Sequence, residues 1–244
     1  MNNNHTGYLL VAHGSRNPQY RTYLNNLADL IRQKLTQKGI PSHLDSCYLE
    51  LSSQSLADKI TEFACFCHQH KYNSIKILPL FLFSGTHVMD DIPEQEAIAF
   101  KNISDLGMDI KILPHLGSES SLTQFLEKKY QKYPNYTRLL ISHGTRLERG
   151  QKEAQLLAKK SSATLAFWSI NPFFDQVIIN LIKSGVENIV MLPYFLFPGK
   201  ITRAIAVRAE EIKNEYNDFN LRIIEPLGAN SELADLITES LLKE

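Results

Sequence analysis

The sequence predicts an α/β protein built from two tandem duplicated modules, each a four-stranded, mainly parallel sheet flanked by helices. Three observations predict this class. Residues 9–16 read LLVAHGSR and residues 139–146 read LLISHGTR, which are identical at five of eight positions. Residues 75–85 and 189–199, IKILPLFLFSG and IVMLPYFLFPG, are identical at seven of eleven. In each half, short apolar runs alternate with longer amphipathic ones, as in parallel sheets that are covered on both faces.

The first copy begins with an apolar run at Tyr8–Ala12, which predicts a buried strand. Asn17 and Pro18 then predict a helix start, with a capping side chain before a proline at the first helical position. We expect this helix to end at Gly39, because glycine commonly terminates helices. The side chains predicted on its buried face are Leu24, Leu27, Ala28, Ile31 and Leu35, at helical spacing.

The other elements continue the same alternation. In the first copy we expect strands at 42–49, 74–80 and 109–113, and helices at 53–70, 90–102 and 120–132. The predicted buried side chains of the helix at 53–70 are Leu56, Ile60, Phe63, Ala64 and Cys67. The second copy predicts strands near 138–142, 163–168, 188–193 and 221–224. The sequence thus predicts an N-terminal domain over 1–134, a C-terminal domain over 135–244, and a cleft between them.

Composition excludes several classes of protein. The 26 Lys and Arg residues balance the 26 Asp and Glu residues, which argues against a dedicated nucleic-acid binder. No apolar run reaches the roughly 18–20 residues of a membrane span, and residues 1–7 lack the apolar core of a secretory signal. Cys47, Cys65 and Cys67 form no CxxC pair, so neither a disulfide framework nor a cysteine zinc site is expected. We expect a cytoplasmic monomer with no membrane or nucleic-acid partner.

Three side chains are expected to meet at one edge of the first sheet. His13 follows the first strand, Glu50 lies at the end of the second, and His87 lies on the loop after the third. Ligands of such sheets bind beyond the carboxyl ends of the strands. Two imidazoles and a carboxylate suit a divalent first-row metal, and imidazole also accepts protons near neutral pH. The alternative is a purely structural histidine at a strand end, with a following glycine that permits a tight turn or the close approach of a ligand.

The second copy retains one of these candidate ligands. His143 matches His13, but aligning the two FLF segments places Ile201 opposite His87, and Ser169 falls opposite Glu50. An isoleucine cannot bind a metal, and one isolated histidine is a poor site. We therefore predict that the first copy carries the chemistry and that the second forms a wall of the cleft.

Basic and apolar residues suggest what the cleft would bind. Several cations follow the repeated motifs, namely Arg16, Arg146, Lys200 and Arg203. Around a cleft they would suit a ligand with several carboxylates, although each alone is equally explained as solvated surface charge. The segments 81–83 and 195–197 would suit a flat hydrophobic body, or they belong to the strand core.

These motifs together resemble those of the sirohydrochlorin chelatases, the class II chelatases, in their long two-domain form. The similarity covers nearly the whole chain and rests on LLVAHGSRNP at 9–18, CYLEL at 47–51 and LPLFLFSGTHVMDDIP at 78–93. The resemblance implies that His13 and His87 bind the incoming metal and help to remove pyrrole protons. It implies that Glu50 is a further metal or proton ligand. It also implies that sirohydrochlorin and a divalent metal are the substrates, and that no cofactor is needed.

The resemblance leaves the metal open. Iron(II), which gives siroheme, is favoured because many organisms that make this tetrapyrrole need siroheme for sulfite and nitrite reduction. Cobalt(II), on the route to cobalamin, is the first alternative, and a non-catalytic tetrapyrrole or metal carrier is the second. A histidine phosphatase is disfavoured because its strand-end histidine follows an arginine, whereas Ala12 precedes His13 and Ser142 precedes His143.

Overall fold

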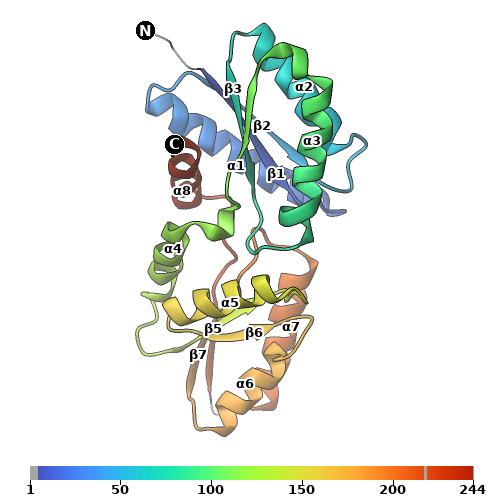
Figure 1. The fold of residues 1–244 in the computed structure, drawn as a ribbon. Coiled ribbons are helices and arrows are strands. Elements are labelled where there is room, and N and C mark those ends of the chain that lie inside the picture. The colour runs from blue at the N-terminus through green and yellow to red at the C-terminus, as the bar shows by residue number, and fades with distance from the viewer. Residues whose placement is uncertain (1–4, 217–218, 244) are drawn as a thin grey trace. The chain divides into compact units, whose positions relative to one another are not determined.

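Strands and helices alternate along the whole chain in a computed structural model, which describes residues 5–216 and 219–243 (Figure 1). The first copy contains β1 (Thr6–Ala12), α1 (Pro18–Gln37), β2 (Ser42–Tyr48), α2 (Leu56–Gln69), β3 (Ser74–Pro79), α3 (Ile92–Asn102), β4 (Asp109–Ile112) and α4 (Ser120–Tyr130). The second contains β5 (Thr137–Ser142), α5 (Glu148–Lys160), β6 (Thr164–Phe167), α6 (Phe174–Lys183), β7 (Asn188–Pro193), α7 (Lys200–Glu215), β8 (Asn220–Ile223) and α8 (Ser231–Leu242). A π-helical turn, His87–Asp91, precedes α3, so the prediction of one regular helix over 90–102 is wrong at its start.

The strands form two four-stranded sheets with the same order. The first sheet runs β2-β1-β3-β4 and the second runs β6-β5-β7-β8, and every pairing is parallel. In both sheets the chain starts on an inner strand, moves to one edge, and then crosses back to the other side. The predicted class, two tandem α/β modules with parallel sheets, is confirmed.

Helix α1 begins and packs as its sequence predicts. The Asn17 side chain accepts a hydrogen bond from the Gln19 backbone N–H at 3.1 Å, and Pro18 is the first helical residue, where its missing N–H costs nothing. The five side chains predicted for its apolar face are the ones that are buried. The start of α1 is therefore fixed by its capping side chain and by its first residue.

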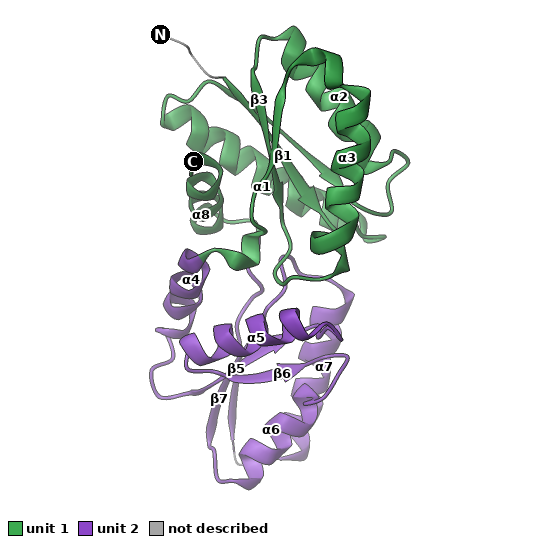
Figure 2. Ribbon diagram, viewed as in Figure 1, with its two compact units in different colours: residues 1–119, 229–244 green, residues 120–228 purple. Residues whose placement is uncertain are grey.

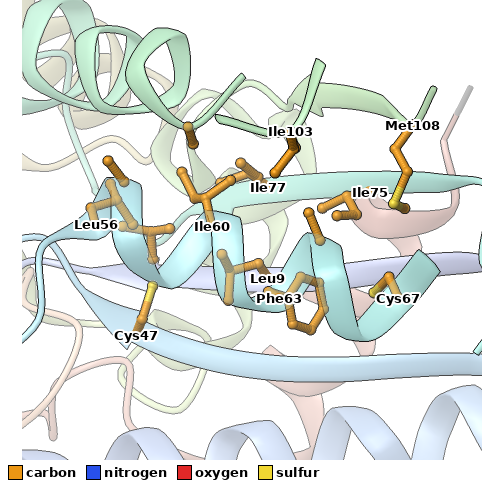
Figure 3. Close-up of a cluster of buried hydrophobic side chains, with 14 of the residues drawn as sticks. Leu9, Cys47, Leu56, Ile60, Phe63, Cys67, Ile75, Ile77, Ile103 and Met108 are labelled. Atoms are coloured by element: carbon orange, nitrogen blue, oxygen red, sulfur yellow. The ribbon is translucent and has the colours of Figure 1, made fainter. Parts of the chain in front are cut away.

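Helix α2 covers one face of the first sheet through a continuous apolar cluster (Figure 3). Leu9 of β1 and Ile77 of β3 contribute from the sheet, and Ile60 and Phe63 contribute from α2. The predicted packing role of Cys67 is confirmed, whereas its neighbour Cys65 is exposed. Burial raises the pKa of the Cys47 and Cys67 thiols to about 12, so neither is a reactive thiolate at neutral pH.

The compact units do not follow the sequence repeats. Unit 1 combines residues up to 119 with residues from 229 onward, and unit 2 consists of residues 120–228 (Figure 2). The last helix of each copy is thus exchanged, because α4 belongs to the unit of the second sheet and α8 to that of the first. The predicted division at 134/135 separates the sequence repeats but not the folded units.

Specific contacts hold each exchanged helix in its unit. Helix α8 packs on α1, and Lys34 of α1 forms a 2.7 Å ion pair with Asp235 of α8. In unit 2, the Tyr130 hydroxyl at the end of α4 donates to the Leu139 carbonyl of β5 at 3.0 Å. Within the described ranges, no helix is long and apolar enough to cross a membrane.

Candidate metal centre

The turn after β1 brings two of the predicted ligands together. Beyond the end of the β1–β2 ladder, the Glu50 backbone N–H donates to the His13 carbonyl at 2.9 Å. Gly14 has a φ of +107°, and a Cβ built there would lie 2.1 Å from the Glu50 carbonyl oxygen. Only glycine fits this position, because the approaching group is the protein's own backbone. Gly14 therefore allows the backbone of Glu50 to lie close to the turn that carries His13. This contact within the protein explains the glycine, so the close approach of a bound molecule is not required to explain it.

The structure places His13, Glu50 and His87 in one cluster, as the topology predicts. The three potential ligand atoms, one from each residue, all lie within 4.8 Å of one another. The Nδ1 of His13 lies 4.0 Å from the Oε2 of Glu50, and the Nε2 of His87 lies 3.9 Å from its Oε1. The two imidazole rings meet edge to face, with centroids 4.6 Å apart.

The distances within the two histidine–glutamate pairs suit a divalent ion. Two ligand atoms about 2.1 Å from one ion are at most about 4.2 Å apart, so each histidine–glutamate pair already has a suitable spacing. Nitrogen and carboxylate ligands fit divalent first-row metals, and three protein ligands leave coordination positions open. The side chains of His13 and Glu50 are about half exposed, at 47% and 48%, so an ion here remains accessible from outside the unit.

Asp91, which the sequence analysis did not single out, lies in contact with one member of the cluster. Its Oδ2 lies 2.6 Å from the Nδ1 of His87, the ring nitrogen that faces away from Glu50. The sequence feature that could have indicated this contact is the spacing in HVMDD, which places a carboxylate four residues after the histidine. His87 thus lies between two carboxylates, with Asp91 at Nδ1 and Glu50 on the side of Nε2.

The second copy lacks an equivalent site. The Ser169 backbone N–H donates to the His143 carbonyl at 2.9 Å, which confirms that Ser169 occupies the position of Glu50. The Ser169 hydroxyl also donates to that carbonyl, at 2.7 Å. Ile201 packs against the apolar core of unit 2. Among the described residues, the cluster of His13, Glu50 and His87 is the one group of three that could hold a metal ion.

The four predicted basic residues are all exposed. Arg16 belongs to unit 1, while Arg146, Lys200 and Arg203 belong to unit 2. Their contacts with substrate carboxylates, and the cleft that they would line, stay predictions. The apolar segments differ between the copies, because residues 81–83 are partly exposed whereas Leu196 and Phe197 are buried.

The fold and the cluster define an α/β protein with a candidate metal site of two histidines and one glutamate beyond the carboxyl edge of a parallel sheet. This chain belongs to the CbiX family, whose model matches residues 7–133 and again residues 137–244. The two matches correspond to the two sequence repeats, so the tandem duplication is confirmed.

Similar proteins include metal chelatases that match nearly the whole of this chain and others that match about half of it. The sirohydrochlorin ferrochelatase of Priestia megaterium is 23% identical over 249 residues, which cover 96% of this chain and 88% of that protein. The sirohydrochlorin cobaltochelatase of Methanosarcina acetivorans is 28% identical over 131 residues, which cover 52% of this chain and 95% of that protein. The structure of SirB from Bacillus subtilis with Fe3+ has the same fold, with a TM-score of 0.81 and 17% identity over 97% of this chain and 94% of that one.

Proposed function

We propose that this protein is a sirohydrochlorin chelatase that inserts a divalent metal ion into the tetrapyrrole. The cluster of His13, Glu50 and His87 in a member of the CbiX family is the observation that carries this proposal. The names of its relatives support sirohydrochlorin as the acceptor. The metal ion is a substrate here, so an exposed site with open coordination positions is an advantage.

The cluster supplies both parts of a metallation reaction. Insertion exchanges two pyrrole N–H protons for one divalent cation. Neutral imidazoles first hold the ion and then accept protons as the ion moves to the ring nitrogens. Glu50 lies within 4.0 Å of both imidazoles and offsets the positive charge of the ion and of the protonated histidines. No step of this exchange needs an additional cofactor.

Iron(II) is the metal that we propose. The relative that matches 96% of this chain is a ferrochelatase, whereas the M. acetivorans cobaltochelatase matches 52% of it. Cobalt(II) is the alternative, since imidazole and carboxylate ligands bind either ion. We also propose that Arg16, Arg146, Lys200 and Arg203 bind substrate carboxylates, and that the protein acts as a cytoplasmic monomer.

Anaerobic incubation with sirohydrochlorin and Fe2+, Co2+ or Ni2+, followed by absorbance, tests the proposal. We expect faster metallation than in the protein-free mixture, and fastest with Fe2+. His13→Ala and His87→Ala should reduce the rate to the spontaneous level. The matched control is His143→Ala, which removes the equivalent histidine of the second copy and should retain most of the activity.

Three outcomes would contradict parts of this proposal. Binding of sirohydrochlorin without acceleration of any metal would instead indicate a carrier. A larger acceleration with Co2+ than with Fe2+ would overturn the choice of metal. A loss in folded His143→Ala as large as that in His87→Ala would show that the first copy does not carry the chemistry alone.

A further inference from the structure

The two histidines of the cluster are held differently. His87 has a carboxylate behind its ring, 2.6 Å from Nδ1, whereas the His13 ring forms no hydrogen bond with any residue that the structure describes. We propose that Asp91 is a positioning residue that fixes the His87 ring with its proton on Nδ1 and its lone pair on Nε2. This inference rests on the proposed function for its biological meaning, but its test does not require the tetrapyrrole.

The chemistry of the contact fixes the tautomer. A neutral imidazole carries one proton, and an ionised carboxylate only accepts hydrogen bonds. At 2.6 Å from Oδ2, the Nδ1 of His87 must therefore be the nitrogen that carries the proton. The remaining lone pair is on Nε2, which lies 3.9 Å from Glu50 within the cluster. The carboxylate also increases the electron density on the ring, which makes Nε2 a better metal ligand.

The π-helical turn holds the two partners in this geometry. Its defining hydrogen bond runs from the Ile92 backbone N–H to the His87 carbonyl. Ile92 is fully buried in the core of unit 1, so the end of the turn is anchored. Such single π turns occur frequently at functional sites. Asp91 is thus attached to the core through its neighbour while its carboxylate reaches the ring.

The second copy provides an internal comparison. The alignment that places Ile201 opposite His87 also places Ile205 opposite Asp91. Both isoleucines contribute to the apolar core of unit 2, and Ile205 is fully buried. The copy without the metal ligand therefore also lacks the supporting carboxylate, as expected if Asp91 serves His87.

Two measurements on the protein without tetrapyrrole test this role. The first is Co2+ affinity, for which we expect Asp91→Ala to bind about 10- to 100-fold more weakly than the wild type. The second is the tautomer of His87 by 15N NMR at about pH 8, where a free imidazole is neutral. We expect a proton on Nδ1 in the wild type and a shift toward Nε2 in Asp91→Ala, with His87→Gln identifying the signals.

The matched control is Asp90→Asn, which removes the adjacent acid of the same turn. Asp90 is exposed and its carboxylate forms no ion pair or hydrogen bond with any described residue, so Co2+ affinity should stay within about twofold. If Asp91→Ala fails to fold, Asp91→Asn is the second variant. Its amide oxygen still accepts from Nδ1, so it should keep the tautomer and lose affinity through the lost charge.

Unchanged Co2+ affinity in both Asp91 variants, or a proton on Nε2 of wild-type His87, would overturn the proposal. Suppose that the Asp91 variants bind Co2+ more weakly than the wild type and Asp90→Asn, but the wild type does not metallate sirohydrochlorin. This result would refute the proposed function and leave the role of Asp91 standing. The two failures are therefore distinguishable.

Discussion

At the scale of single residues, the candidate metal site depends on one glycine as much as on the three side chains of the cluster. Gly14 allows the backbone of Glu50 to lie against the turn that follows β1, and this contact places the carboxylate beside His13. Other residues would need both a strained φ and a displaced Glu50. The HG pair of the motif therefore combines a candidate ligand with the residue that allows the next candidate ligand to lie close to it.

We expect Gly14→Ala to weaken both stability and metal binding. A non-glycine residue with positive φ costs roughly 1–2 kcal/mol, and the 2.1 Å overlap with the Glu50 carbonyl adds to this cost. The control is Gly107→Ala, since Gly107 also has a positive φ, of +60°, but no atom within 4 Å of the added Cβ. Urea unfolding should show a larger loss of unfolding free energy for Gly14→Ala than for Gly107→Ala, and Co2+ titration should show a larger loss of affinity. Equal losses in the two variants would mean that the close contact with Glu50 is unimportant.

The sequence predicted that the three candidate ligands meet, but it did not reveal Asp91, and the reason is geometric. His13, Glu50 and His87 each follow a strand, and strand order alone brings them to one edge. The partnership of His87 with Asp91 depends instead on a π-helical turn. A regular helix was predicted from residue 90 onward, which would have left the histidine outside the helix and the aspartate unrelated to it.

At the scale of elements, the exchanged helices are the feature that sequence patterns could not reveal. The strands and the apolar faces of α1 and α2 follow from the spacing of apolar residues, and the structure confirms them. The destination of α4 and α8 does not follow, because an amphipathic helix presents a similar apolar stripe to either sheet. The contacts that hold each helix in its unit, such as the Lys34–Asp235 ion pair of α8 and the Tyr130–Leu139 hydrogen bond of α4, do not follow from the spacing of apolar residues.

A substitution in α8 should therefore damage unit 1, although α8 belongs to the second sequence repeat. Ile237 is fully buried, and Ile237→Ala should cost about 2–5 kcal/mol of unfolding free energy. The exposed Glu239 of the same helix is the control, for which Glu239→Ala should cost less than about 0.5 kcal/mol. Hydrogen exchange should locate the loss in α1 and β1. A loss of hydrogen-exchange protection confined to unit 2 would contradict the assignment of α8 to unit 1.

At the scale of the whole molecule, metal binding should stabilise the units unequally. The three ligands all belong to unit 1. At an ion concentration about 100 times the Kd, binding adds about 2.7 kcal/mol to the unfolding free energy of the unit that contains the three candidate ligands. We therefore expect Co2+ to slow hydrogen exchange in β1, β2 and α8, with little change in α5 and β7.

Removal of Co2+ with EDTA should restore the faster hydrogen exchange. In His87→Ala, Co2+ should not slow the exchange in the first place. Equal protection of β7 would indicate a further metal site in unit 2 or unfolding of both units in one step. The latter outcome would still show how strongly the two units are coupled in solution.

The exchange of helices also determines the order in which the protein is completed during translation. Unit 2 is one continuous stretch, whereas unit 1 lacks α8 until all of residues 120–228 have been made. At roughly 5–20 residues per second, the 109 residues of the stretch 120–228 take about 5–20 s to synthesise. During that interval the nascent chain already carries His13, Glu50 and His87, but one face of their sheet still lacks its last helix. The first unit to emerge from the ribosome is thus the last to receive all of its helices.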